Sequence, residues 1–483
     1  MPAEIWSVGG GLVEEIRLSR FAKFAFGMGG IANGVKLAAL STFLMLFYNQ
    51  VLGLRPEVVA TVIMITLVFD AAFDPLIGYW SDNLRTRWGR RHPFLYASML
   101  PYPLLFLALW NPPDLSHSGL AVYLLAVLVL LRFFDTFFEL PAWALGPELA
   151  RDYDDRTEIS AWRAACGILG TATISLLAYN VFLKEGPGGT GGVLSRDGYL
   201  DYSLAAGAAI FISIAFAAAG THRYIPQLRK PEKRELTLAQ VAREFRDSIS
   251  DRSFVAVALG GLLAATANGM SQGIDIYWRL YLYKLSQAQI SVLVIVAVVA
   301  SVFGTIMARK LSSRFGKRNA AAGLFVTSLV GSIAPLFLVI NGIVSQPEVI
   351  FILLFPFAAM STGANACALV MMGSMLMDTV EQVELKTGRR SEGLLMSIES
   401  LVKKVTSGVG ILFAGLILAA VAFPAGAERA DIPMPTLREM AYYYIPIKSG
   451  IIAVCLACLS FYSLNRDSHA ENLTQLRDRN PAE

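Results

Sequence analysis

Charged residues are scarce in this sequence. Asp, Glu, Lys and Arg make up 16% of the 483 residues, whereas hydrophobic residues make up 55% and the mean hydropathy is +0.53. A soluble protein of this length carries more charge, so we expect an integral membrane protein embedded in the lipid bilayer. Long apolar runs recur along the chain, which favours a helical bundle over a β-barrel of short alternating strands.

Histidine and cysteine are also rare, with four of each. The histidines fall in loops or near the ends of apolar runs, and the cysteines are scattered through those runs. Neither group has the spacing of a metal centre or a catalytic cluster. We therefore expect no cofactor, no disulfide and no enzyme activity. The net charge of +4 is explained by basic loops and needs no nucleic-acid partner.

The apolar runs predict an all-α membrane protein with about twelve transmembrane helices. The expected spans are 24–50, 58–81, 94–111, 119–147, 160–183, 201–222, 253–283, 288–308, 320–341, 348–377, 394–422 and 441–464. Basic residues crowd the N-terminus and the loops after the second, eighth and tenth spans, while the alternate loops are nearly bare. This asymmetry predicts a cell-membrane protein with both termini in the cytoplasm.

The chain divides into two similar halves. We expect an N-terminal six-helix bundle at 1–222, a cytoplasmic linker at 223–252, a C-terminal six-helix bundle at 253–464 and a cytoplasmic tail at 465–483. Corresponding loops echo each other, with Arg-Trp-Gly-Arg-Arg at 87–91 and Arg-Phe-Gly-Lys-Arg at 314–318. Such duplication is typical of transporters whose two bundles move about a midplane site. A channel is the less favoured alternative, because the charges are not repeated around an axis.

Two carboxylates lie inside the second span. Asp70 and Asp74 are four residues apart, so a helix places them on one face, roughly 6 Å apart. A charge near mid-bilayer costs roughly 2.5–3.5 kcal/mol on insertion scales, and two like charges cost more unless a cation or a shared proton lies between them. The pair predicts a cation or proton site. The alternative is that both aspartates only cap or bridge neighbouring helices.

The fourth span carries a second polar stripe, formed by Arg132, Asp135 and Glu139. Arg132 and Asp135 could simply neutralise each other. Glu139 lies one turn from Trp143, and a carboxylate beside an indole suits a polyol, since the carboxylate accepts hydroxyl hydrogen bonds and the indole packs on a sugar ring. Arg163, in the fifth span, either extends to the cytoplasmic surface or reaches inward to Glu139.

Other polar residues at membrane depth need partners. Burying Lys403 and Lys404 in span eleven is costly unless an acid pairs with them, and span two supplies two acids. Weaker candidates for a polar cavity are Asn33 and Lys36 in span one, Asp275 and Arg279 in span seven, and Asn365 in span ten.

A family resemblance rests on these residues. The motifs are Asp70-x-x-x-Asp74-Pro75 with Gly78 and Asp82, Arg87-Trp88-Gly89-Arg90-Arg91-x-Pro93, Glu139-x-Pro141, Arg156 with Arg163, and Asp378-x-x-Glu381 through Arg390-x-Glu392-Gly393 before Lys404. In this order, over nearly the whole chain, they resemble the glycoside–pentoside–hexuronide:cation symporters, the melibiose-permease branch of the major facilitator superfamily.

The resemblance implies two six-helix bundles, alternating access, and uptake of a sugar or glycoside coupled to Na⁺, H⁺ or Li⁺. It places Asp70, Asp74 and Thr136 at the cation site with Lys404 nearby, and Glu139, Trp143 and Arg163 at the sugar site. We add Asn33 and Lys36 as candidate substrate contacts. We also expect Asp82, Arg90 and Arg91 to hold the cytoplasmic ends of the first bundle and stabilise the outward-open state, with Asp378 and Arg390 as further gating residues.

Two departures from the family pattern affect these expectations. Phe73 stands where the melibiose permease has an amide side chain, so one oxygen ligand is missing, and helix one lacks a clear acidic partner. A dry site with fewer oxygen ligands favours a proton over Na⁺, so we expect H⁺ coupling, with a possible Na⁺ site at Asp70 and Asp74 as the alternative. A monomeric carrier of a sugar or glycoside is expected. A lysolipid cargo on the same fold stays open.

Overall fold

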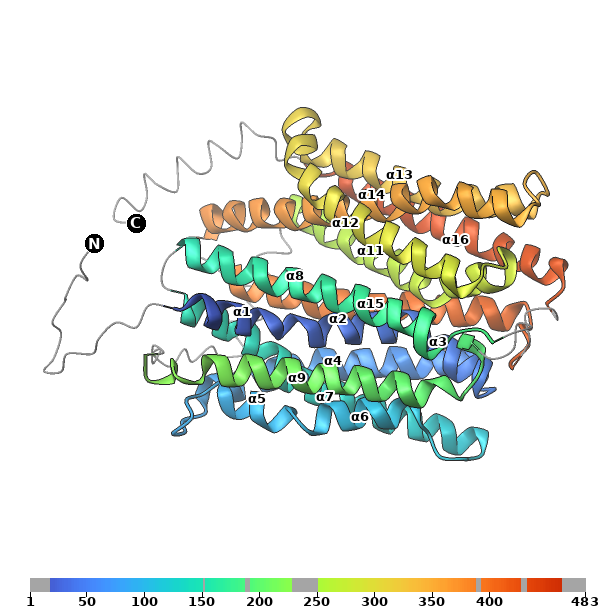
Figure 1. The fold of residues 1–483 in the computed structure, drawn as a ribbon. Coiled ribbons are helices and arrows are strands. Elements are labelled where there is room, and N and C mark those ends of the chain that lie inside the picture. The colour runs from blue at the N-terminus through green and yellow to red at the C-terminus, as the bar shows by residue number, and fades with distance from the viewer. Residues whose placement is uncertain are drawn as a thin grey trace, which may run out of the picture.

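The computed structural model is built almost entirely of long helices (Figure 1). The structure describes residues 18–150, 153–186, 192–227, 251–387, 392–426 and 432–462. Within these ranges there is no β-strand, and Thr86 and Gly89 form an isolated bridge. Twelve helical stretches are long and apolar enough to cross a membrane, as the sequence predicts.

The first half of the chain supplies six of these stretches. They are built from α1 (Arg20–Met28), α2 (Gly30–Ala38) and α3 (Leu44–Leu46) with the π-helical turns η1 (Ala39–Phe43) and η2 (Phe47–Val51), α4 (Pro56–Asn83), α5 (His92–Ser98) with α6 (Pro101–Trp110), α7 (His117–Leu149), α8 (Tyr153–Leu177) with η3 (Ala178–Phe182), and α9 (Gly198–His222). The short turns η4 (Gly192–Leu194) and η5 (Ile225–Gln227) flank α9.

The second half supplies the other six. They are α11 (Arg252–Tyr277) with the π-helical turn η6 (Trp278–Leu282), α12 (Gln287–Phe315), α13 (Lys317–Ile340), α14 (Pro347–Thr387), α15 (Glu392–Ala420) and α16 (Met434–Ser460). In Figure 1 the blue-to-green helices lie together below most of the yellow-to-red ones, and α15 packs against α4 of the first half. The predicted domain boundaries stay a prediction, since much of the linker and the tail lie outside the described residues.

Span ends predicted from hydropathy are wrong in four helices. Helix α14 continues to Thr387 rather than ending at 377, and α8 begins at Tyr153 rather than at 160. Helix α12 continues to Phe315 rather than ending at 308, so Arg309, Lys310 and Arg314 lie on its last turns and not in a loop. Helix α16 begins at Met434, seven residues before 441. Hydropathy marks where a helix leaves the hydrocarbon, whereas its backbone hydrogen bonds continue into the headgroup region.

The sequence signals for helix ends explain where α12 begins and ends. Ser286 accepts the Gln289 backbone N–H while the Gln289 side chain accepts the Ser286 N–H, a reciprocal cap that starts the helix. Gly316 follows the last residue with a φ of 76°, a conformation that favours glycine, and α13 starts at the next residue. The basic loop is therefore a single tight turn.

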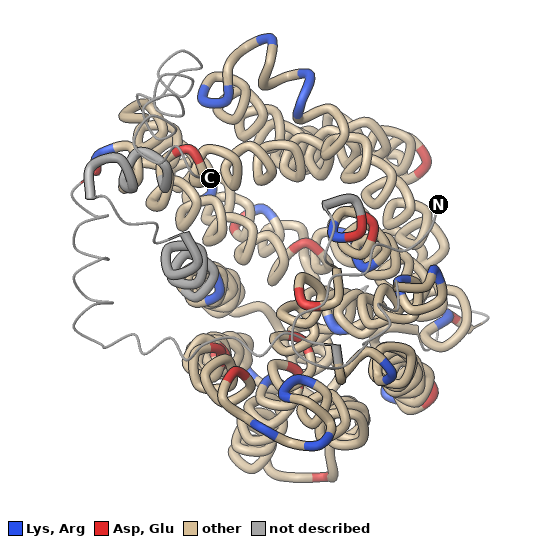
Figure 2. Tube along the Cα trace, turned by 90° about the vertical axis from the view of Figure 1, so that its left-hand side faces the viewer, with Lys and Arg blue, Asp and Glu red and all other residues tan. Residues whose placement is uncertain are grey.

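One end of the molecule is basic. We call it the basic end and define it by the loop 84–91, the last turns of α12 and the start of α13. Figure 2 looks onto the side of the molecule that carries it, and Lys and Arg gather there on loops and helix ends. We call the opposite end, where η2 and η6 lie, the distal end.

The two halves are hydrogen-bonded to each other at the distal end. The Tyr277 hydroxyl donates to Asn49 Oδ1 at 2.8 Å, and the Tyr281 hydroxyl donates to Gln50 Oε1 at 3.0 Å. Gln50 Nε2 also donates to the carbonyl oxygen of Pro424 at 3.0 Å. These groups are buried, so each bond matters more than it would in water. We call this set the distal latch.

Candidate functional site

The acid pair of α4 meets a lysine from the other half of the protein. Lys404, on α15, places Nζ 2.7 Å from Asp74 Oδ2 and 3.2 Å from Asp70 Oδ2. Asp70 also accepts hydrogen bonds from Thr136 Oγ1 at 3.2 Å and from Arg132 at 3.4 Å, both on α7. The structure thus brings together all four residues predicted for the cation site, with an ammonium group between the two carboxylates.

Phe73 lies beside this pair without adding a polar atom. Its ring packs on Phe69, with centroids 6.1 Å apart, and on Phe133 at 5.2 Å. An aromatic contact therefore occupies the position next to Asp74. Among the residues that the structure describes, no group of three or more His, Cys, Asp and Glu side chains could hold a metal ion.

A second cluster lies on α7 and α2. Lys36 Nζ donates to Asp135 Oδ2 at 2.7 Å and to Glu139 Oε2 at 2.8 Å. The pairing of Arg132 with Asp135 is therefore wrong, because Arg132 turns to Asp70 and Thr66 while Lys36 neutralises Asp135. Residues three apart on a helix can pair, but a cation on a facing helix reached Asp135 at a shorter distance.

Close helix packing positions Lys36. Helices α2 and α8 approach so closely that a Cβ on Gly34 would lie 2.1 Å from the Gly167 carbonyl oxygen. Glycine alone permits this approach, which is a common way to pack membrane helices. Lys36 follows Gly34 by half a turn and reaches α7. Asn33, one turn before Lys36, is half-buried.

Arg163 lies inside the bundle and does not extend to the surface. It is 3% exposed, and its guanidinium carbon lies 4.7 Å from the centre of the Trp143 ring. Its two terminal nitrogens have no hydrogen-bond partner in the described parts of the chain. Its interaction with Glu139 is a longer-range electrostatic attraction and not a hydrogen bond. Buried donors without partners are costly, so this group is suited to a ligand's oxygen atoms.

Trp143 and Glu139 present the features predicted for a polyol site. The Trp143 side chain is 52% exposed although it lies within a membrane-crossing helix, and its indole Nε1 donates to Glu139 Oε1 at 3.4 Å. An indole face, a carboxylate and unused guanidinium donors lie together here. Such a set can stack on a sugar ring and hydrogen-bond to its hydroxyls.

The charges of these groups balance. Four cations and four carboxylates make up what we call the central charge cluster: Lys36, Arg132, Arg163, Lys404, Asp70, Asp74, Asp135 and Glu139. A neutral cluster lowers the cost of burying charge at membrane depth. Adding a proton or a cation therefore leaves a net positive charge and disturbs an existing pair.

The predicted gating residues form a separate network at the basic end. Arg91 lies 2.5 Å from Asp82 and 3.0 Å from Glu148, and Arg90 lies 2.7 Å from Glu148. Glu148, near the end of α7, was not predicted. The sequence signal was available, because Arg90 and Arg91 are two cations beside one acid, Asp82, and Glu148 directly follows the fourth predicted span, which ends on the same side of the membrane.

The second half repeats this arrangement. Lys317 at the start of α13 lies 2.7 Å from Asp378, near the end of the membrane-crossing part of α14, and the Tyr462 hydroxyl donates to Asp378 at 3.1 Å. Asp378 corresponds to Glu148, and Lys317 corresponds to the Arg90–Arg91 pair. Arg390, also predicted to act in gating, lies outside the described residues.

Fold and site together define a class of protein. Twelve membrane-crossing helices in two related sets, with charged side chains paired at membrane depth across them, are the arrangement of a major facilitator transporter. The chain is accordingly a multi-pass membrane protein that carries small molecules and is not an enzyme. A model of the MFS/sugar transport protein family matches residues 25–466, so the chain belongs to that family.

Similar proteins cover nearly the full length. An uncharacterized symporter of Synechocystis sp. is 25% identical over 95% of this chain and 96% of its own. The isoprimeverose transporter of Lactiplantibacillus pentosus is 23% identical over 92% of this chain and 88% of its own. Among solved structures, a bacterial homologue of the lysosomal transporter Spinster superposes with a TM-score of 0.61 at 13% identity, covering 95% of this chain and 97% of its own, which shows the shared fold.

Proposed function

We propose that the protein is a cation-coupled symporter of a sugar or glycoside, that the coupling ion is H⁺, and that it works by alternating access as a monomer in the cell membrane. We also propose that the basic end faces the cytoplasm, in keeping with the excess of Lys and Arg there. Membership of the sugar transport family and the similarity to an isoprimeverose transporter support the substrate class.

The observation that carries the proposal is the position of Lys404. It lies on α15 of the second half and pairs with Asp74 and Asp70 on α4 of the first half. A proton on Asp74 Oδ2 removes the charge that holds Lys404 at 2.7 Å and so loosens a contact between the halves. Protonation and the relative motion of the two bundles are linked by the same bond.

The same contact argues against Na⁺ as the coupling ion. The Lys404 ammonium already lies between the carboxylates, so Na⁺ would enter beside a like charge. Phe73 offers no oxygen atom in compensation. A proton needs no coordination shell and can bind a single carboxylate oxygen.

Uptake into proteoliposomes tests the coupling ion. Uptake should depend on an inward proton gradient, stop when a protonophore is added, and change little when Na⁺ is replaced by choline. Asp74→Asn should retain substrate exchange and lose accumulation. Asp114→Asn, at an exposed surface carboxylate, is the matched control and should behave as wild type. Stimulation by Na⁺ at constant pH, with no protonophore effect at a clamped membrane potential, would show that the site binds sodium.

The substrate is identified by ligand screening. Thermal shifts over sugars, glycosides, uronates and lysolipids, with and without Na⁺, separate the sugar carrier from a lysolipid carrier. The direction of net transport is a further question for the flux assay, since a candidate 2,3-dihydroxypropane-1-sulfonate exporter of Escherichia coli is 22% identical over 96% of this chain and 97% of its own.

A further inference from the structure

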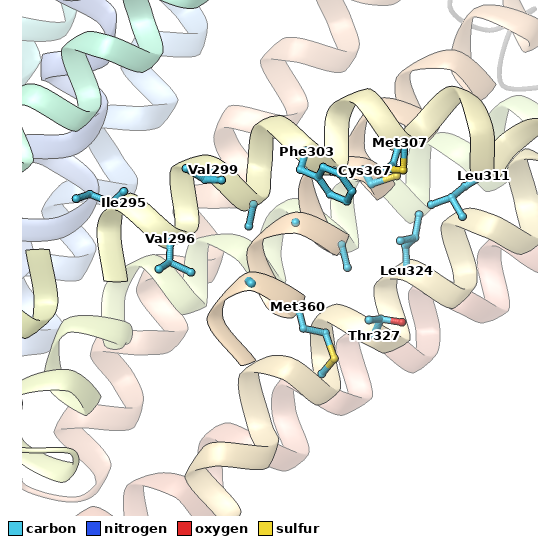
Figure 3. Close-up of a pocket in the computed structure, with 15 residues that line it drawn as sticks. Ile295, Val296, Val299, Phe303, Met307, Leu311, Leu324, Thr327, Met360 and Cys367 are labelled. Carbon is cyan, nitrogen blue, oxygen red and sulfur yellow. The ribbon is translucent and has the colours of Figure 1, made fainter. Parts of the chain in front are cut away.

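A groove runs along the outer face of the second half. It lies between α12, α13 and α14, has a volume of about 540 Å³, and is lined almost wholly by apolar side chains (Figure 3). Val299 and Phe303 on its α12 wall are each 62% exposed. Because these helices cross the membrane, the groove opens to lipid and not to water.

The floor of the groove is set by close backbone packing. A Cβ on Gly304 of α12 would lie 2.1 Å from the Gly363 carbonyl oxygen of α14. Small residues at this crossing leave a channel between the larger side chains of α12 and α13, such as Met307, Leu311 and Leu324, which Figure 3 places along its walls. The shape comes from the fixed packing of three helices, so the groove exists before any lipid enters it.

Basic residues stand at one end of this groove. Arg314 follows Met307 by seven residues and Leu311 by three, so it continues the lining face of α12 beyond the groove. Lys310 follows Phe303 by seven residues and lies on the adjoining stripe. Both side chains are exposed, and neither has a hydrogen bond or an ion pair with a residue that the structure describes. The Arg314 guanidinium only stacks on Phe315, at 5.3 Å.

These features match one kind of ligand. A lipid in the leaflet at the basic end places its headgroup at the level of the last turn of α12 and an acyl chain roughly 15 Å into the bilayer, half of the hydrocarbon thickness. Along a helix that depth is about ten residues, which corresponds to the stretch from Leu311 to about Ala300. The phosphate would then meet Lys310 and Arg314 while the chain follows the groove.

We infer that this groove with Lys310 and Arg314 is a binding site for an anionic phospholipid of the membrane leaflet at the basic end. The net negative headgroup supplies the charge that the two cations lack among the residues that the structure describes, and the acyl chain fills the groove. The site lies on the outside of the second half, away from the central charge cluster. The inference therefore does not depend on which substrate or coupling ion the protein uses.

Native mass spectrometry of the full-length protein, titrated with phosphatidylglycerol, tests the inference. Each Lys or Arg near an anionic headgroup contributes about 1 kcal/mol, so Lys310→Gln with Arg314→Gln should weaken binding about thirtyfold. The matched control is Arg85→Gln with Arg87→Gln, which removes two exposed charges from the same end of the protein away from the groove. The control variant should bind within about twofold of wild type.

A second pair of variants tests the acyl-chain half of the site. Thr327→Phe and Ala359→Phe each place a ring in the groove and leave the cations intact, and each should weaken phosphatidylglycerol binding at least fivefold. Phosphatidylcholine should bind the wild type at least tenfold more weakly. Equal losses in the loop control, unchanged binding in both groove variants, or equal affinity for phosphatidylcholine would each overturn the inference. Thermal unfolding in detergent checks that every variant is folded.

Discussion

Lys36 illustrates how single residues acquire their roles here. From the sequence, the side chain could have faced lipid, a cavity or protein. In the structure its Nζ donates to carboxylate oxygens of Asp135 and Glu139, at 2.7 and 2.8 Å. Glu139 accepts from Lys36 with one carboxylate oxygen and from the Trp143 indole with the other. Lys36, predicted to contact the substrate, thus also holds Glu139, the carboxylate predicted to accept the substrate's hydroxyls.

The first prediction concerns that pair. Glu139→Gln and Trp143→Ala should each weaken substrate binding at least tenfold, about 1.4 kcal/mol, because one removes a charged acceptor and the other a stacking face. Isothermal titration with the sugar found by screening measures this. Trp88→Ala, in the exposed basic loop, is the control and should bind normally. Sugar binding that survived both changes would contradict the assignment of Glu139 and Trp143 to the sugar site. Tolerance of Trp143→Ala alone would favour a lysolipid as the substrate.

At the level of elements, the loop between α4 and α5 is held to the end of α7. Arg91 contacts both Asp82 and Glu148, while Arg90 contacts Glu148. The two acids differ in setting, since the side chain of Asp82 is 57% exposed and that of Glu148 is 11% exposed. Water screens the first contact far more than the second. The network therefore depends mainly on Glu148.

The second prediction follows from this difference. Asp82→Asn should shift the protein toward the state open at the basic end by less than about 1 kcal/mol, the usual range for an exposed pair. Glu148→Gln should shift it further, because removing one partner of a buried pair costs about 3–5 kcal/mol. Cysteine accessibility at both ends measures the shift. An unchanged balance in both variants would remove this network from the gating mechanism.

The distal latch is the corresponding element at the other end. It joins the π-helical turn η2 to the end of α11 and to η6, and π-helical turns are frequent at functional sites. The third prediction is that Tyr277→Phe and Tyr281→Phe each shift the equilibrium toward the state open at the distal end by about 1 kcal/mol, about fivefold.

Distances between spin labels on the two halves report that shift. Tyr48→Phe is a suitable control, because the Tyr48 hydroxyl donates to Leu109 within the first half and its loss removes a hydrogen bond of the same kind without touching the latch. If the control variant opened the distal end as much as the latch variants did, the latch would have no special role.

At the scale of the whole molecule, transport requires the two halves to meet and separate. Helix α15 packs on α4 near the distal end, where a Cβ on Gly415 would lie 2.3 Å from the Ala60 Cβ and 2.9 Å from the Pro56 carbonyl oxygen. The halves can close there only because no side chain intervenes. Lys404 spans the same interface about three turns away.

The fourth prediction tests this closure. Gly415→Val should abolish transport and hold the protein open at the distal end, because the added atoms collide with the Ala60 Cβ and the Pro56 carbonyl oxygen, neither of which can rotate aside. Substrate binding from the distal side should survive. Gly373→Val, at a site with no atom within 4 Å of an added Cβ, is the control and should transport normally. Normal transport by Gly415→Val would show that the helices separate at this crossing without loss of function.

Much of the fold follows from the sequence alone. Span-length apolar runs dictate helices, because a lipid-embedded backbone must satisfy its own hydrogen bonds, and the echo between 87–91 and 314–318 indicates the duplication. The sequence also predicted which acids and cations at membrane depth are functionally important, since an unpaired charge there is too costly to be incidental. The ends of the helices were harder to predict, and α12 and α16 both extend beyond the spans predicted from hydropathy.

The partners of those charges were decided only by the tertiary structure. Arg132 has Asp135 three residues away on its own helix, yet it pairs with Asp70, and Lys36 on the closely packed helix α2 pairs with Asp135 instead. The contacts of Glu148 and the distal latch likewise join segments that are distant in sequence, and the groove depends on how three successive helices pack. A linear sequence specifies which side chains must find partners in the membrane, but helix packing sets the distances, and electrostatic attraction falls with distance.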